Sequence, residues 1–590
     1  MILNSGKIHR MQNVERDSRI RAVSVFFILI SFIIIVRLFI LMVIQHSFYA
    51  ALAADSHEMY EKLVPRRGDI FIQDTRSKEE FPLAINKDVF LLYADTREIR
   101  SDDEANRVAN ELARIFNFDD EKKLNISLSL NKRSDPYEPL KQDIDQNLAD
   151  QISSLGLPGL HFVRQDKRFY PEGKLAAHVA GFLGQDTEGT IAGRYGIEGY
   201  WQDTLSGRGG FSEGVRSAKG GWISLAGRLF KPAQDGSEFL LTIDRSIQYK
   251  TCEVLRESMK EYGAKSATAI VMDPYSGALI ALCSLPDFDP NAYSAVENIE
   301  VYNNSAIFTP YEPGSIYKPI IMAAALNEEV VDQNTPFYDE GSRPGICQTP
   351  IRNAGRKSYQ QTDMTGVLVN SINTGMVHIA EKLGKNRLVD YVEKFGFSVK
   401  TGIELDTEVN GNIDSLYIHS TDQLDCYAAT ASFGQGITVT PLQMTAAYAA
   451  IANGGRLLKP YLVQEIRHSD GTVERTRVQE IKQVLNNRAA SLLSGMLVRT
   501  VDYGHAKAAR IKGYYVAGKT GTAQIPGPGG YTEETNHSFV GFAPVDHPKF
   551  VMLVKFEKPK AEYAETTAVP AFGKIAAFIL DYYQVPPGRD

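Results

Sequence analysis

The chain has 590 residues and a mass of 65.5 kDa, too large for one hydrophobic core, so we expect several domains. Its hydrophobic content of 43% and charged content of 23% are those of a globular protein. The formal net charge of -7 argues against nucleic acid as a partner, because domains that bind nucleic acid are usually basic.

Residues 22–44 form an apolar segment long enough to cross a bilayer as a helix. Basic residues gather before it, and the next one after it is Lys62. The positive-inside rule therefore predicts a cytoplasmic tail at 1–21, a retained anchor at 22–44 and an exported remainder. A cleaved signal peptide is the alternative. Arg37, inside the span, either reaches the outer head groups or contacts a partner membrane protein.

Residues 45–235 carry mixed strand and helix patterns with many charges and no catalytic constellation. We interpret 65–70 and 195–200 as structural connections, and the whole region as a pedestal that lifts the next domain off the membrane. Ser129 and Lys132 form an S-x-x-K here. Their stretch is charged and lacks a helix-start pattern, so we interpret this copy as a chance match.

Residues 236–590 have the pattern of an α+β domain. Residues 267–272 and 278–283 are predicted strands, joined by a turn into a hairpin. Helices are predicted at 315–327, 364–395 and 571–583, and three further strands at 514–524, 537–542 and 549–556. Strands from both ends of the domain predict one antiparallel sheet, with a helical subdomain inserted between them.

The four cysteines are scattered, at Cys252, Cys283, Cys347 and Cys426. They form no C-x-x-C pair or zinc-ligand spacing, and no H-E-x-x-H motif occurs, so we predict neither a metal nor a cofactor. Cys283 ends an apolar run, which favours a buried thiol. Because the number of cysteines is even, disulfides stay open for an exported chain.

Ser315-Ile316-Tyr317-Lys318 is a second S-x-x-K. Residues i and i+3 share a helix face, so the Lys318 amine can reach the Ser315 hydroxyl and activate it as a nucleophile. The preceding Glu-Pro-Gly is typical of a loop that leads into a helix, whose N-terminus favours developing negative charge.

Ser371-Ile372-Asn373 follows the short apolar run 367–369. This S-x-N offers a hydroxyl that can relay a proton and an amide that can donate and accept hydrogen bonds. A polar loop between two helices is the alternative interpretation.

Lys519-Thr520-Gly521-Thr522 follows an apolar predicted strand, and its glycine would let a substrate backbone approach closely. A second K-T-G occurs at 400–402, near acidic residues, as in a loop. It follows Asn373 too closely to leave room for the helical insertion. We therefore assign the functional motif to Lys519.

S-x-x-K, S-x-N and K-T-G in this order resemble the penicilloyl-serine transferase superfamily. Anchor, pedestal and late catalytic domain together are similar to class B, monofunctional penicillin-binding proteins over nearly the whole chain. Segments 286–291, 433–436, 440–443 and 453–455 fit this family too. Two segments depart from it: Ile316 stands where members carry a small residue, and 72–76 replaces the usual Asp-Arg-Asn-Gly.

The resemblance implies an antiparallel five-stranded sheet flanked by helices, an all-helical subdomain and peptidoglycan D,D-transpeptidase activity in septal cell-wall synthesis. It also implies roles for the motif residues: Ser315 as nucleophile, Lys318 as general base, Ser371 as proton relay, Asn373 holding the donor peptide, Lys519, Thr520, Gly521 and Thr522 at its terminal carboxylate, and the backbone N–H groups of Ser315 and Thr522 as the oxyanion hole.

Expected partners are peptidoglycan stem peptides, β-lactams as covalent inhibitors, a SEDS-family glycosyltransferase and other division proteins, at the cell membrane. The alternatives are an elongation-type transpeptidase, a D,D-carboxypeptidase or β-lactamase, and a non-catalytic division scaffold or β-lactam sensor.

Overall fold

The structure, a computed structural model, describes residues 31–32, 34–35, 58–185, 189, 191–215, 229–419 and 422–589. Apart from the first four of these, the anchor predicted at 22–44 lies outside the described residues. Among the residues described, no helix has the length and hydrophobicity needed to cross a membrane. The chain divides into two compact units, residues 1–65 with 208–234, and residues 66–207 with 235–590.

The smaller unit contains a three-stranded antiparallel sheet in the order β1-β8-β9. Its strands are β1 (Glu58–Leu63), β8 (Gly210–Val215) and β9 (Leu229–Lys231). The chain therefore leaves this sheet after β1 and returns to it about 150 residues later by numbering, at Gly210.

A seven-stranded sheet in the larger unit runs in the order β19-β18-β10-β2-β3-β4, and β5 also pairs with β3. β10 pairs in parallel with β2 and antiparallel with β18, so residues from both sides of position 235 share this sheet. Its strands are β2 (Ile70–Gln73), β3 (Glu80–Ala94), β4 (Glu138–Ile144), β5 (Leu160–Phe169), β10 (Glu238–Asp244), β18 (Val463–Arg467) and β19 (Val473–Arg475).

Three helices, α3 (Asp102–Phe116), α4 (Asp120–Leu130) and α5 (Gln146–Ser154), form a separate small core with the far end of β3. Ser129 lies in the last turn of α4, whose N-cap is Asp119, and Lys132 pairs with Glu138. The expectation that this S-x-x-K does not stand at a helix start is confirmed, because the aspartate cap that opens α4 lies ten residues before Ser129.

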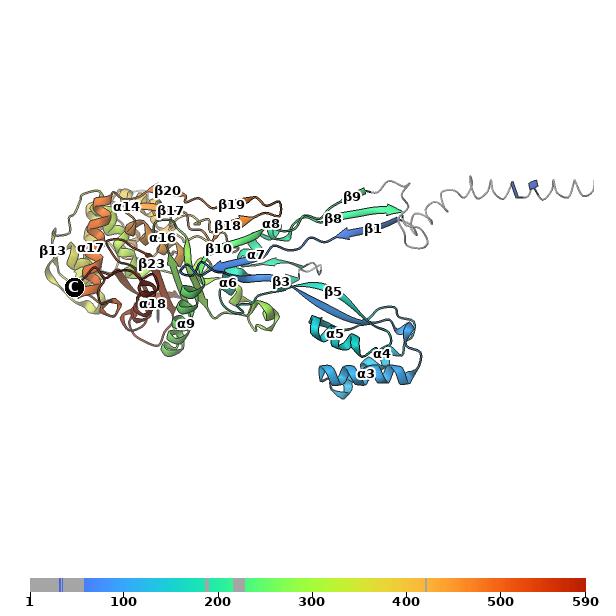
Figure 1. The fold of residues 1–590 in the computed structure, drawn as a ribbon. Coiled ribbons are helices and arrows are strands. Elements are labelled where there is room, and N and C mark those ends of the chain that lie inside the picture. Colours follow the sequence, from blue (N-terminus) through green and yellow to red (C-terminus); the bar gives the residue numbers. More distant parts are fainter. Residues whose placement is uncertain are drawn as a thin grey trace, which may run out of the picture. The chain divides into compact units, whose positions relative to one another are not determined.

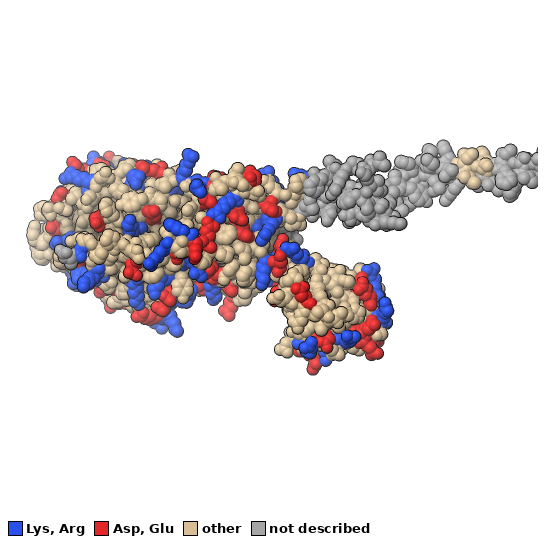
Figure 2. All heavy atoms as spheres, viewed as in Figure 1, with Lys and Arg blue, Asp and Glu red and all other residues tan. Residues whose placement is uncertain are grey.

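Charged side chains of both signs are intermixed on the face of the larger unit seen in Figure 2. One group of charges is buried instead. Glu198, fully buried on α7 (Gly196–Tyr200), accepts from Arg67 Nε at 2.7 Å and from Arg168 Nε at 2.6 Å. The two segments interpreted as structural connections, 65–70 and 195–200, are thus joined to each other by the Arg67–Glu198 ion pair.

The second large sheet has five antiparallel strands in the order β12-β11-β23-β22-β21, which confirms the predicted sheet; its middle strand, β23, is labelled in Figure 1. Its strands are β11 (Ser266–Met272), β12 (Leu279–Leu285), β21 (Ala517–Gly527), β22 (Gly530–Ala543) and β23 (Phe550–Glu557). Helices α9 (Arg245–Tyr262) and α18 (Ala568–Tyr582) cover one face, and α16 (Pro441–Ala452) covers the other.

Between β12 and β21 lies the predicted helical insertion (Figure 1). Its principal helices are α11 (Lys318–Asn327), α12 (Met364–Val369), α13 (Asn373–Leu383), α14 (Lys385–Lys394), α15 (Cys426–Ala431), α16 and α17 (Asn487–Tyr503). Short strands edge it: β13 (Pro336–Asp339) with β16 (Gln360–Asp363), β14 (Ser342–Arg343) with β15 (Ile351–Arg352), and β17 (Arg456–Leu458) with β20 (Glu480–Gln483).

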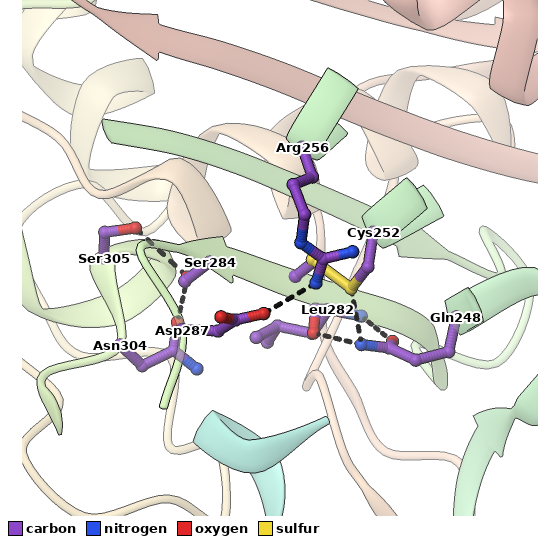
Figure 3. The surroundings of a disulfide bond; sticks show 9 residues. Gln248, Cys252, Arg256, Leu282, Ser284, Asp287, Asn304 and Ser305 are labelled. Atoms are coloured by element: carbon purple, nitrogen blue, oxygen red, sulfur yellow. Dashed lines mark hydrogen bonds and ion pairs between the residues drawn. A yellow bond between two sulfur atoms is a disulfide. The ribbon is translucent and has the colours of Figure 1, made fainter. Parts of the chain in front are cut away.

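All four cysteines are in disulfides, Cys252–Cys283 and Cys347–Cys426. The first joins α9 to β12, next to Gln248, whose amide donates to Leu282 O at 2.8 Å and accepts from Leu282 N at 2.7 Å (Figure 3). The expectation of a free thiol at Cys283 was wrong. Its local apolar pattern contains no information about the helix that brings Cys252 against the strand.

Candidate active site

Ser315 lies in a single 3-10 turn, Gly314–Tyr317, that leads directly into α11. Two hydrogen bonds with residues outside the turn hold it in place. Gly314 N donates to Gly434 O at 3.0 Å, and Tyr448 Oη donates to Ile316 O at 2.7 Å. Gly434 must be glycine, because its φ is 82° and a Cβ there would lie 2.2 Å from Gly314 O. Ile316, which follows Ser315, is fully buried in the main core.

Lys318 opens α11 and is fully buried. Its Nζ donates to Ser371 O at 2.6 Å and to Asn373 Oδ1 at 2.7 Å, and lies 3.1 Å from Ser371 Oγ. Ser371 Oγ in turn lies 3.0 Å from Ser315 Oγ. The hydrogen bonds therefore connect Lys318 to Ser315 through Ser371, whereas helical spacing alone predicted a direct contact.

The S-x-N turn is a helix C-terminus of the Schellman type. Ser371 N donates to Leu368 O at 3.2 Å, and Ile372 N donates to Val367 O at 2.9 Å. Ser371, the residue after the helix C-cap, adopts the left-handed conformation with φ 55°. Glycine usually occupies this position in a Schellman motif. A non-glycine residue in this conformation is strained, and such strain is common at functional sites.

Lys519, near the start of β21, is 2% exposed, and its Nζ donates to Thr520 O at 3.1 Å. Burial lowers the pKa of Lys519 to about 7. Burial, and secondarily the charge of Lys519, lower the pKa of Lys318 well below its ordinary value. Two cations in one desolvated place disfavour each other, so this site can supply a neutral amine as a base and attract an anionic ligand.

β21 packs against the turn that bears Ser315, which brings the third motif beside the first. A Cβ on Gly521 would lie 2.7 Å from Ser538 Oγ and 3.1 Å from Pro313 O, so close packing within the protein already requires this glycine. Thr522 Oγ1 accepts from Ala564 N at 3.1 Å, which leaves the hydroxyl hydrogen of Thr522 free to donate.

The competing K-T-G at 400–402 lies in a loop. The Glu408 carboxylate accepts from Thr401 N at 2.7 Å, from Thr401 Oγ1 at 2.6 Å and from Gly402 N at 3.0 Å. The Glu408 carboxylate therefore gives this K-T-G a structural role, because it holds the loop at 400–402 in place.

Sequence reasoning treated Glu312 only as part of a loop. Its carboxylate is nearly buried, and accepts from Gly436 N at 3.0 Å and from Tyr531 Oη at 2.9 Å. Burial raises the pKa of Glu312. The residue ties the segment just before Ser315 to the 433–436 loop and to β22, two segments far away in sequence.

Sequence profiles of two families match the chain. The penicillin binding protein transpeptidase domain matches residues 267–577, and the penicillin-binding protein dimerisation domain matches residues 62–241. The chain is 32% identical to stage V sporulation protein D of Bacillus subtilis, over 98% of this chain and 88% of that protein. It is 29% identical to the peptidoglycan D,D-transpeptidase FtsI of Escherichia coli K12, over 86% of this chain and 82% of that protein.

Among solved structures, penicillin-binding protein 3 of Mycobacterium tuberculosis in complex with aztreonam has a TM-score of 0.67 at 24% identity, covering 90% of this chain and 98% of that chain. Fold and motifs define a serine acyl-transfer enzyme of the penicillin-binding type. Because the transpeptidase match alone spans more than half of the chain and follows a dimerisation domain, the protein belongs to the class B penicillin-binding proteins, the D,D-transpeptidases. The predicted family is confirmed.

Proposed function

We propose that this protein is a membrane-anchored enzyme that cross-links peptidoglycan during cell division through an acyl-enzyme on Ser315. The observation that carries the proposal is the hydrogen-bonded series Lys318–Ser371–Ser315, with distances of 3.1 and 3.0 Å. It places a buried amine and a relaying hydroxyl behind one nucleophile, as acyl transfer by serine requires.

In the acylation step, Ser315 Oγ attacks the penultimate D-alanine carbonyl of a donor stem peptide. Lys318, whose pKa is lowered by burial and by the charge of Lys519, takes the proton of Ser315 by way of the Ser371 hydroxyl. The backbone N–H groups of Ser315 and Thr522 form the oxyanion hole, worth roughly 2.7–4 kcal/mol per donor. As the peptide C–N bond breaks, Ser371 passes a proton to the leaving D-alanine.

The remaining motif residues bind the donor peptide. Asn373 holds its amide, while Lys519, Thr520 and Thr522 receive its terminal carboxylate beside the close-packed Gly521. An anion there stabilises the protonated form of Lys519, whose pKa burial lowers to about 7. The amine of a second stem peptide then attacks the ester and frees Ser315. β-Lactams acylate Ser315 and remain attached.

We further propose the domain limits 22–44 for the anchor, 45–235 for the pedestal and 236–590 for the transpeptidase domain, with 1–21 in the cytoplasm and the rest outside the cell membrane. The basic residues before position 22 support this orientation. Export is also consistent with two disulfides. The anchor places the enzyme beside a SEDS-family polymerase and other division proteins.

A role in sporulation is the second candidate, favoured by the 32% identity to stage V sporulation protein D. Depletion in the source organism separates the two roles. Loss of a division enzyme gives filaments during growth, whereas loss of a sporulation enzyme leaves growth normal and spores defective.

The decisive experiment compares Ser315→Ala with Ser129→Ala by labelling membranes with a fluorescent penicillin. We expect the first variant to lose all covalent label and the second to label like the unaltered protein. Label that survives Ser315→Ala would overturn the nucleophile assignment. With a stem-peptide substrate, the ratio of cross-linked dimer to released D-alanine then separates transpeptidase from carboxypeptidase.

A further inference from the structure

A buried carboxylate lies at the end of β13 in the helical insertion, outside all three motifs. Asp339 is fully buried and its two oxygens accept four hydrogen bonds. The donors are Thr374 Oγ1 at 2.6 Å, Asn353 Nδ2 at 2.8 Å, Tyr359 N at 2.8 Å and Gly341 N at 2.9 Å. Within the described ranges, Asp339 forms no ion pair, so neutral donors alone offset the cost of burying its charge.

Two of these donors belong to the segments that hold Asn373. Thr374 is the next residue in α13. Asn353 follows Arg352, whose carbonyl accepts from Asn373 Nδ2 at 3.0 Å. Thr374 N also donates to Asn353 Oδ1 at 3.1 Å, which ties the two segments directly to each other. The Asp339 carboxylate therefore fixes both the segment that carries Asn373 and the Arg352 carbonyl to which the Asn373 amide donates.

These contacts determine which way the Asn373 amide faces. With Nδ2 bonded to Arg352 O, its Oδ1 faces Lys318 Nζ at 2.7 Å. The same Nζ is bonded to Ser371. If Thr374 and Asn353 moved apart, Asn373 would lose its fixed orientation, and Lys318 would lose one of the acceptors that keep it aligned with Ser371.

We propose that Asp339 is a positioning residue for acylation. Through Thr374 and Asn353 it holds Asn373 so that Lys318 stays aligned with Ser371 and Ser315. The inference rests on the proposed function, because it presumes that Lys318 and Ser315 perform the acyl transfer. Asp339 itself touches neither residue; it acts through the segments that it joins.

The test measures time-resolved labelling of the full-length protein in detergent by a fluorescent penicillin, at several concentrations. This separates the dissociation constant of the non-covalent complex from the acylation rate constant, and the final label counts folded enzyme. We expect Asp339→Asn to lower the rate constant at least about tenfold, because displacing a catalytic group by about 1 Å can cost about a hundredfold.

The matched control is Asp244→Asn. Asp244 is also fully buried, and accepts from Thr75 N at 2.8 Å, Ile247 N at 2.9 Å and Tyr582 Oη at 3.0 Å, none of which adjoins the site. We expect Asp244→Asn to reduce the amount of folded protein but not its acylation rate constant. Equal slowing by both variants would overturn the inference, because a general loss of stability would explain it.

Thr374 provides a milder pair of variants should Asp339→Asn fail to fold. Thr374→Val removes the hydroxyl donor, whereas Thr374→Ser retains it. We expect slow acylation from the first and recovery by the second. Unaltered rate constants in Asp339→Asn and Thr374→Val, with label still dependent on Ser315, would overturn this inference alone. Label independent of Ser315 would instead refute the proposed function.

Discussion

Replacing Ser371 by alanine and by glycine separates the backbone strain of the S-x-N turn from the chemistry of its hydroxyl. Both variants lose the hydroxyl that links Lys318 to Ser315. Loss of a proton relay costs roughly 10²–10⁴-fold in rate, so we expect both to acylate slowly and by similar factors. They differ only in whether position 371 carries a Cβ.

At φ 55° a Cβ costs about 1–2 kcal/mol, and glycine removes this cost. Glycine has a more flexible unfolded chain, which offsets about 0.5–1 kcal/mol of the gain. We therefore expect the glycine variant at 371 to be roughly 0.5–1 kcal/mol more stable than the alanine variant. Ser491, exposed within α17, is the control. There alanine should be the more stable by about 0.5–1 kcal/mol.

Urea unfolding of the full-length protein in detergent, with fluorescent-penicillin labelling on the same preparations, measures both effects. The expected result is opposite signs of the glycine-minus-alanine difference at 371 and 491. Glycine that is less stable than alanine at both positions would refute the view that Ser371 is strained. Fast labelling by either variant at 371 would refute its role as a relay.

Three further outcomes follow from the structure. Glu198→Ala should lower the free energy of unfolding by about 3–5 kcal/mol, because Arg67 and the buried Arg168 lose the carboxylate that both contact, and Arg168 keeps only its longer pair with Asp69 at 3.7 Å. Glu111→Ala, in an exposed pair, should cost at most about 1 kcal/mol by the same urea assay. Carboxylate-bearing β-lactams should bind the Ser315→Ala variant more weakly as the pH rises above about 7. The reason is that burial lowers the pKa of Lys519 to about 7, and the ligand carboxylate needs the protonated form of Lys519. Constant affinity from pH 6 to 9, by fluorescence titration, would contradict this. Replacing both Cys252 and Cys283 by alanine should lower the free energy of unfolding by about 3–4 kcal/mol relative to the oxidised wild type, because the bond closes a loop of 31 residues. The difference should disappear when both proteins are unfolded under reducing conditions.

The sequence predicted the parts of the site that local pattern and order determine. The apolar runs of β11, β12 and β23 located the sheet, and the order of the three motifs selected Ser315 and Lys519 over their competing copies. β22 begins at Gly530, seven residues before its predicted start. The first part of this strand pairs with β21 but is mostly polar and exposed, so it has no apolar pattern that could have indicated a strand.

Long-range partners could not be predicted in this way. Nothing in the segment around β10 indicates that it pairs with β18, more than 200 residues later by numbering. For the same reason the disulfide partner of Cys283 and the bond from Thr374 to Asp339 were missed. The left-handed conformation of Ser371 was hidden because glycine, its usual marker, is absent from the turn.

The place of β23 in the five-stranded sheet has a consequence for biosynthesis. β23 is the middle strand, although it is the last of the five to be synthesised. Until it arrives, the β11–β12 hairpin and the β21–β22 hairpin share no strand, and distant pairing of this kind is slow. The five-stranded sheet therefore cannot form before β23 is made, and any premature stop codon before position 550 should produce a protein in which the two hairpins lack their shared middle strand.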